Sequence, residues 1–140
     1  MTYFIDTSVV MYAGGAEHPH RPACRAVMEA VANGSLYATT STEVVQEILH
    51  RFSRGRREIG ERMTRSVLNV FDDILPIDRA VIADTVIRYR NNPGLSARDA
   101  IHVATCSRAG ISSIVSLDTD FDNVDGIQRV DPADALHPPA

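Results

Sequence analysis

The sequence predicts an α/β fold with a central parallel sheet of four to five strands. Short apolar runs rich in β-branched and aromatic residues alternate with segments of helical periodicity, which is typical of a parallel sheet covered by helices. The chain has 140 residues, of which 44% are hydrophobic and 23% charged, so it can form a globular domain with a real core. Because no repeat or linker interrupts it, a single domain is expected over residues 1–140.

The first half of the chain predicts strands alternating with helices. Val44, Ile48 and Phe52 recur at four-residue spacing, which indicates an amphipathic helix. Paired glycines and an Asn-Gly step end the two helices that precede it. In order, we expect a strand over 2–6, a helix over 8–13, a loop over 17–22, a helix over 23–32, a strand over 36–39, and helices over 39–54 and 59–71.

The second half continues the alternation. The stretch Asn-Asn-Pro-Gly stops one helix, and Gly110 closes the next. In order, we expect a strand over 74–78, helices over 79–90 and 96–110, a strand over 112–118, a fifth strand over 127–131 and a tail over 132–140.

Composition limits the cellular setting and the chemistry. There is no transmembrane run and no signal-peptide layout at the N-terminus, so we expect a cytoplasmic protein without a membrane partner. Two cysteines, Cys24 and Cys106, are too few for a disulfide framework. All fourteen basic residues are arginine, and the lack of lysine argues against P-loop, haloacid-dehalogenase-type and receiver-type phosphate sites.

The net charge of −4 gives no general attraction for nucleic acid, but the arginines are unevenly distributed. Six fall between residues 51 and 65, among them Arg51, Arg54, Arg56 and Arg57. These side chains either steer RNA phosphates or form a solvated helix face.

An acidic run follows the fourth expected strand. The stretch 116–126, "SLDTDFDNVDG", resembles a calcium loop, yet counting from Asp118 the sixth position is Asn123 and the twelfth is Arg129. The turn glycine and closing acid of an EF-hand are both missing, so calcium is disfavoured. We expect Asp118 to end the strand and Asp120 to reach the same site from the loop.

The rest of this run has structural explanations. Phe121 is expected to anchor the loop in the core, whereas Asp122 and Asp125 are explained by turn formation. Asp6 ends the first expected strand, as Asp118 ends the fourth. If these strands are neighbours where the strand order reverses, both carboxylates face one crevice.

Further acids lie on helices. Asp99 follows Ser96 in a capping-box-like arrangement, and Thr40 with Glu43 forms another, so both acids have local explanations. Glu47 has none, although it lies beside the apolar stripe of its helix. A carboxylate at a buried face needs a partner, which makes Glu47 the functional candidate and Glu43 the structural one.

Four segments of the chain, in order, carry a family resemblance: "FIDTSVVMYA", "VVQEILHRF", "SARDAIHVATC" and "IVSLDTDFD". They resemble the motif segments of PIN-domain ribonucleases, most closely the VapC-type toxins of bacterial toxin–antitoxin pairs. The resemblance implies a PIN-like α/β/α sandwich. It carries the family's acids over to Asp6, Glu47, Asp99 and Asp118, with Asp120 as a further acid and Ser8, or Thr7, as the family's small hydroxyl residue.

The resemblance also implies an activity and partners. Converging carboxylates repel one another unless a cation neutralises them, and hard oxygen ligands suit Mg²⁺ or Mn²⁺. We therefore expect a metal-dependent endoribonuclease with Asp6, Asp99, Asp118 and Asp120 as metal ligands, Glu47 as a ligand or water-orienting group, and Ser8 near a metal-bound water or phosphate. A small antitoxin and a homodimer are implied as partners, with a groove for the antitoxin between Val44 and Phe71.

Several alternatives stand beside this interpretation. The chain could be an RNA-processing nuclease without an antitoxin, or an inactive module that binds RNA or protein. His18, His20 and Cys24 could suggest a transition-metal site, but without a second ligand pair a plain loop is favoured. His102 is expected to be a satisfied helix histidine rather than a ligand or base.

Overall fold

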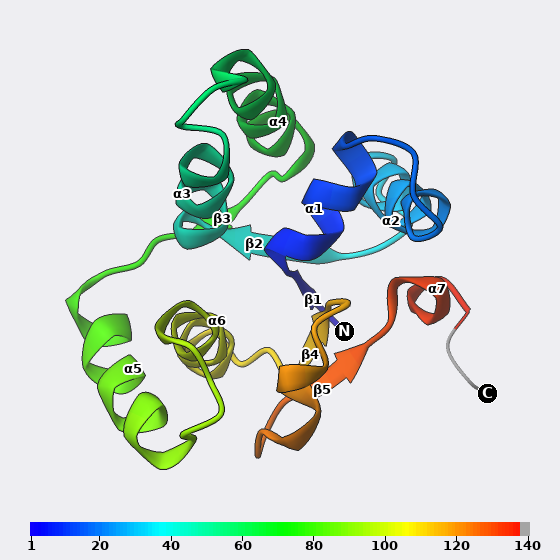
Figure 1. Ribbon diagram of the computed structural model, residues 1–140. Coiled ribbons are helices and arrows are strands. Elements are labelled where there is room, and N and C mark those ends of the chain that lie inside the picture. Colours follow the sequence, from blue (N-terminus) through cyan, green and yellow to red (C-terminus); the bar gives the residue numbers. More distant parts are fainter. Residues whose placement is uncertain (138–140) are drawn as a thin grey trace.

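The computed structural model describes residues 1–137, and within them it contains one five-stranded parallel sheet. The strands lie in the order β3-β2-β1-β4-β5 (Figure 1). Their bounds are Tyr3–Ile5 for β1, Ala38–Ser41 for β2, Ile74–Leu75 for β3, Ser113–Val115 for β4 and Gln128–Val130 for β5. The α/β class predicted from the sequence is confirmed.

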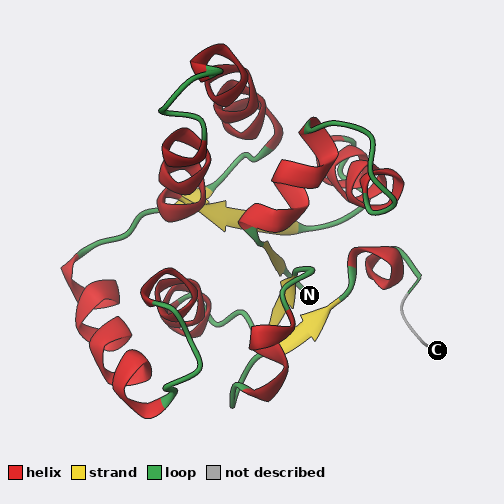
Figure 2. Ribbon diagram, viewed as in Figure 1, coloured by secondary structure: helices red, strands yellow, loops and turns green. Residues whose placement is uncertain are grey.

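Helices cover both sides of this sheet (Figure 2). Figure 1 shows α1 to α4 on one side of the strands and α5, α6 and the short 3-10 helix η1 on the other. The bounds are Thr7–Gly14 for α1, Arg21–Ala32 for α2, Thr42–Arg51 for α3, Arg57–Val70 for α4, Arg79–Asn91 for α5, Ala97–Arg108 for α6, Thr119–Asn123 for η1 and Pro132–Ala135 for α7. Between residues 1 and 137, no helix combines the length and apolar composition needed to cross a bilayer.

Three local expectations are wrong. The fourth strand ends at Val115, and Asp118 instead caps η1 by accepting a hydrogen bond from the Asp120 amide at 2.9 Å. Residues 132–135 form α7 rather than a tail, because Asp131 caps the helix; residues 138–140 lie outside the described part.

The cap of α3 also lies one residue later than expected. Ser41, not Thr40, accepts the hydrogen bond from the amide of Val44. Thr40 is fully buried and its hydroxyl donates to the carbonyl of Ile5 at 2.9 Å. Thr40 therefore ties β2 to β1, and the strand rather than the helix determines its orientation.

The pairing of β1 with β4 positions the site. β1 pairs with β2 on one side and with β4 on the other, all in parallel. Directly after β1, the amide of Asp6 donates to the carbonyl of Val115 at 3.0 Å. Phe4, Ile5 and Ile114 are fully buried beneath this junction. The strand order therefore reverses at a well-packed point, and binding sites in open α/β sheets form at such points.

Phe121 anchors the segment that carries Asp118 and Asp120, and its side chain is fully buried. We predict that Phe121→Ala lowers the free energy of unfolding by about 3 to 5 kcal/mol, because it leaves a cavity in the core. Tyr37→Ala is the control, since that ring is 74% exposed. Urea unfolding measures both, and equal losses would contradict the anchoring role.

Candidate functional site

The acids from four segments of the chain face one cavity at the carboxyl edge of the sheet. This cavity has a volume of ≈ 490 Å³, and Asp6, Glu47, Asp99 and Asp118 lie in its wall. Strand β1 and helix α1 position Asp6, and α3 positions Glu47. Helix α6 positions Asp99, and the loop after β4 positions Asp118. The fold thus gathers residues that are up to 112 positions apart in the sequence.

Three of the acids form a tight group. Asp99, Asp118 and Asp120 each offer a carboxylate oxygen, and these oxygens all lie within 4.8 Å of one another. Burial, followed by the negative charge of Asp118 and then of Asp6, raises the pKa of Asp99 from 3.8 to about 6, while His102 acts in the opposite direction. Within the described residues this is the one group of three or more side chains suited to a metal ion.

Asp6 lies outside this group and is held by hydroxyls. Its Oδ2 accepts hydrogen bonds from Ser8 Oγ at 2.8 Å and from Ser116 Oγ at 2.6 Å. The amide of Leu117 donates to Ser8 Oγ at 3.2 Å, and the amide of Asp118 donates to Ser116 Oγ at 2.9 Å. The two serines therefore link Asp6 to the loop after β4.

The sequence identified Ser8 as a site residue but did not identify Ser116. Ser8 was expected beside a metal-bound water or phosphate, and the structure places it against Asp6. Ser116 was not singled out, although it is fully buried. A hydroxyl residue directly after an apolar strand, two positions before Asp118, is the signal that could have identified it.

His102 contradicts the expectation of a satisfied helix histidine. It is fully buried, and neither ring nitrogen has a hydrogen-bond partner among residues 1–137. Its Nε2 lies 3.7 Å from Oδ1 of Asp6 and 3.8 Å from Oε1 of Glu47. Residue 102 lies one turn after Asp99 on α6, so its ring is directed toward Asp6 and Glu47 beneath the cavity wall.

The charges around His102 and Glu47 favour their ionised forms. Burial alone would lower the pKa of His102, but Glu47, Asp6 and Asp99 outweigh it and raise the pKa. Burial alone would raise the pKa of Glu47, but His102, Thr7 and Arg98 outweigh it and lower the pKa. A proton on His102 would therefore offset part of the repulsion between the two carboxylates.

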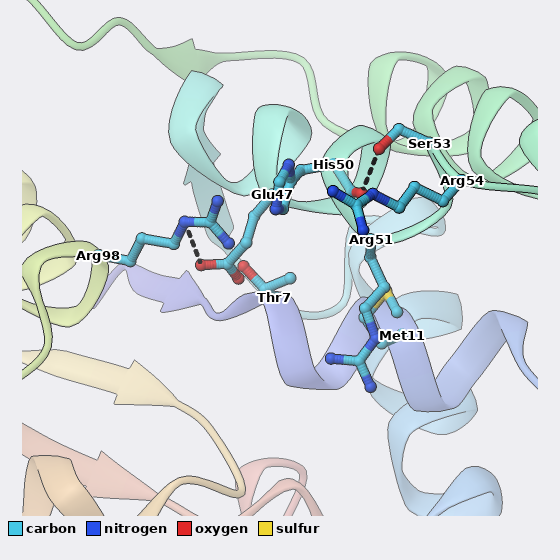
Figure 3. Close-up of a pocket in the computed structure, with 8 residues that line it drawn as sticks. All are labelled: Thr7, Met11, Glu47, His50, Arg51, Ser53, Arg54 and Arg98. Atoms are coloured by element: carbon cyan, nitrogen blue, oxygen red, sulfur yellow. Dashed lines mark hydrogen bonds and ion pairs between the residues drawn. The ribbon is translucent and has the colours of Figure 1, made fainter.

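Glu47 and Glu43 share an arginine that the sequence did not single out. Arg98 Nε lies 3.9 Å from Glu47 Oε1 and 3.8 Å from Glu43 Oε1. Figure 3 shows the Glu47 carboxylate between Thr7 and Arg98. Glu47 lies in the wall of the acidic cavity and Glu43 does not, which is the arrangement that a functional Glu47 requires.

A second cavity adjoins the first and is rich in basic side chains (Figure 3). It has a volume of ≈ 520 Å³, and the residues that it shares with the acidic cavity are Thr7, Met11, Glu47, Arg51 and Arg98. Of the four arginines expected near RNA, Arg51 and Arg54 lie in its wall. Arg56 is exposed and in the left-handed conformation (φ 48°), and Arg57 donates to the carbonyl of Ser53 at 3.2 Å.

The loop with His18 and His20 does not form a three-ligand metal site. Cys24 is fully buried in the core, and burial, with a contribution from Asp131, raises the pKa of its thiol to about 11. The two histidines are exposed and contact the ring of Tyr12 instead, His18 at a tilt of 46° and His20 edge-on at 79°, with ring centroids 4.7 and 5.4 Å from it.

Comparisons with known proteins agree with this geometry. Residues 3–127 match the PIN domain family. The ribonuclease VapC13 of Mycobacterium tuberculosis is 35% identical over 130 residues, which cover 90% of this chain and 97% of that protein. VapC7 of the same species is also 35% identical over 130 residues, covering 91% and 90%. Among solved structures, VapBC2 from Rickettsia felis bound to a promoter DNA fragment has a TM-score of 0.74 at 13% identity, covering 94% of this chain and 98% of that one.

The raised pKa of Asp99 makes the metal-free stability depend on pH. Its carboxyl has an ordinary pKa of 3.8 when unfolded and about 6 when folded, so it stabilises the fold below pH 4 and that contribution is lost as the pH rises through 6. We predict that, in EDTA at pH 7.5, Asp99→Asn raises the free energy of unfolding. The gain is on the order of 1 kcal/mol, because solvent screens part of the repulsion at a half-buried group.

This gain should disappear near pH 4, where the native carboxyl is protonated. Urea unfolding at both pH values measures it, with Asp125→Asn as a control in an exposed turn. A variant that is less stable than the native chain at pH 7.5 would contradict the repulsion described here.

Proposed function

The chain belongs to the PIN-domain family, in the group of the VapC ribonucleases, and from this premise we propose that it is a metal-dependent endoribonuclease acting as the toxin of a toxin–antitoxin pair. One observation carries the proposal: the acids of all four resembling segments, Asp6, Glu47, Asp99 and Asp118, face one cavity. We propose a single PIN domain over residues 1–140 and a cytoplasmic location.

The residues of the cavity fit a hard divalent cation. Asp99, Asp118 and Asp120 offer oxygen atoms within 4.8 Å of one another, and burial together with the charges of Asp118 and Asp6 raises the pKa of Asp99. Oxygen-only ligands suit Mg²⁺, with Mn²⁺ able to substitute. When bound, the ion would neutralise this charge, activate a water and polarise the phosphodiester. Asp6 would join these ligands directly or through a water.

The remaining side chains position and polarise the reactants. Glu47 is kept ionised by His102, Thr7 and Arg98, so it can accept a hydrogen bond from an attacking water and orient it. The serine hydroxyls hold Asp6 in one orientation and leave its Oδ1 facing His102. A preorganised carboxylate needs no rearrangement when charge develops at the phosphate.

Basic side chains lie where the phosphates of an RNA would approach the acids. Arg51 and Arg98 line both the acidic and the basic cavity, Arg54 and His50 line the basic one, and all four could contact phosphates next to the scissile one. Arg56 and Arg57 lie outside this wall, so we assign them to the solvated face of α4. The acidic centre alone would repel an anionic substrate, and the adjoining arginines offset that repulsion.

An antitoxin segment could bind between α3 and α4. A cavity of ≈ 460 Å³ lies there, and Leu49, Phe52 and Gly60 contribute to its wall. Leu49 is 45% exposed, and an added Cβ on Gly60 would lie 3.0 Å from the Cβ of Phe52. The rest of the wall is polar, and a groove that combines apolar and polar side chains suits an amphipathic helix.

We also propose that the toxin forms a homodimer, as the resemblance implies. Helix α5 provides an apolar surface for such contacts, since Ile82, Val86, Ile87 and Tyr89 are between 44% and 62% exposed.

We predict that Asp6→Asn and Asp118→Asn each lower Mg²⁺-dependent RNA cleavage by about 100-fold or more, because each removes a charge from the metal centre. Glu47→Gln should show a comparable loss. Glu43→Gln and Asp125→Asn should remain near native, since neither side chain lies in the acidic cavity. Cleavage of total RNA by purified protein measures this, with circular dichroism to confirm folding.

Asp120→Asn should cause a partial loss, since this acid shares the group but is exposed to solvent, whereas Asp99 and Asp118 are half-buried. Mg²⁺ affinity, read by thermal shift, should fall in parallel. If Glu43→Gln abolishes cleavage and Glu47→Gln does not, the helix acid is wrongly assigned. A native protein that binds RNA without cleaving it in Mg²⁺ or Mn²⁺ would favour the inactive binding module.

A separate prediction concerns the antitoxin. Co-expression with the product of a small neighbouring gene should yield a tight complex and restore growth. Leu49→Arg should weaken that complex by at least about 10-fold, because it places a charge in the groove, while cleavage by the free toxin stays unchanged. A chain that captures no small partner would instead favour an RNA-processing nuclease without an antitoxin.

A further inference from the structure

Three rings form a cluster at the edge of the acidic cavity. Tyr12 comes from α1, and His18 and His20 come from the loop between α1 and α2. The ring centroids lie 4.7 Å apart for Tyr12 and His18, 5.4 Å for Tyr12 and His20, and 5.1 Å for the two histidines. The amide of His20 donates to Nδ1 of His18 at 3.2 Å, which fixes the orientation of the loop ring.

The ring cluster connects two cavities. Tyr12 lies in the wall of the acidic cavity together with Asp6, Asp99 and Asp118. On the other side, His18 lies in the wall of a cavity of ≈ 640 Å³ that includes Glu17, Arg21 and Arg25. The rings therefore begin beside the candidate metal centre and lead outward to a surface that carries two arginines and one acid.

Core packing does not account for this cluster. His18 and His20 are exposed and Tyr12 is only half-buried, whereas the core residues around them, such as Val9 and Cys24, are fully buried. The chain has only four tyrosines, four phenylalanines and no tryptophan, and this is its one contact group of three aromatic or imidazole rings among residues 1–137. Exposed planar rings beside a nucleic-acid site are suited to stacking on bases.

We infer that Tyr12, His18 and His20 form a stacking site for an unpaired base close to the scissile phosphate. The inference rests on the proposed ribonuclease function and adds one contact to it: an unpaired base next to the scissile phosphate lies against these rings. A base in a duplex is stacked on its neighbours and cannot occupy this site without unpairing. Arg21 and Arg25 lie in the wall of the same outer cavity as His18, so their charges favour a phosphate beyond that base.

Base stacking gives the expected size of the effect. Removing an aromatic partner of a base costs enough affinity to weaken binding by about 5- to 100-fold. We therefore expect Tyr12→Leu to raise the KM for an unstructured 12-nucleotide RNA by about 10-fold, with kcat within about twofold of native. Tyr12→Phe keeps the ring and should stay near native. Tyr37→Leu, at a 74% exposed tyrosine before β2, is the matched control.

A second readout does not depend on cleavage. The same RNA carrying 2-aminopurine at single positions is bound in EDTA, where stacking quenches its fluorescence. The native chain and Tyr12→Phe should quench it at one position, and Tyr12→Leu should not. The double variant His18→Leu/His20→Leu, at exposed loop positions, should also lose quenching, which keeps the test valid if Tyr12→Leu fails to fold.

The outcomes separate the two levels of inference. If the native chain cleaves RNA, and Tyr12→Leu and the double variant match it in KM and quenching, the stacking site is wrong and the nuclease function stands. Cleavage of a duplex as efficient as that of the single strand also overturns it. A native chain that quenches 2-aminopurine but never cleaves with Mg²⁺ or Mn²⁺ overturns the proposed function and retains the stacking site.

Discussion

The parallel pairing of β1 with β4 brings the acids together, and it therefore creates both the site and the electrostatic repulsion within it. It places the residue after the first strand beside the loop after the fourth, so carboxylates that are more than 100 positions apart in sequence share one cavity. Like charges at this distance are unfavourable in a partly buried setting. Much of the surrounding structure can be understood as a response to that repulsion.

Different neighbouring groups act on each of the carboxylates. Asp6 is stabilised by two serine hydroxyls, and Glu47 by Thr7, His102 and the guanidinium of Arg98. At Asp99, burial and the charges of Asp118 and Asp6 outweigh the contributions of His102 and Ser96, so its pKa is raised rather than lowered. The protein thus neutralises the carboxylates near β1 with its own groups and leaves the uncompensated charge at Asp99, where Asp118 and Asp120 also converge. That is the point at which a cation would contribute most to stability.

The sequence predicted those features that a local pattern encodes. Alternation of strands and helices identified the α/β class. The capping box that set Glu43 apart from Glu47 relied on Thr40, whereas the structure places the cap at Ser41. Features that depend on a distant partner were missed. Thr40 bonds to β1 across 35 positions, Ser116 bonds to Asp6 across 110, and His102 faces acids from two other elements. Periodicity indicates which face a residue occupies, but not which side chain it meets there.

Helix α1 connects the chemistry to the recognition of the substrate. Its first turn holds Thr7 and Ser8 against the acids, and its second half presents Tyr12 to the ring cluster. Val9 and Val10 are buried between these points, so packing fixes the helix relative to the sheet. A helix of eight residues is short and stiff, and it therefore holds a stacked base at a constant distance from the candidate metal centre. Arg51 at the end of α3 and Arg54 just after it line the cavity on the other side of the acids, so the proposed RNA strand would meet basic groups on both flanks. A net charge of −4 is compatible with such a substrate, because the local charge around the cavity matters more than the total.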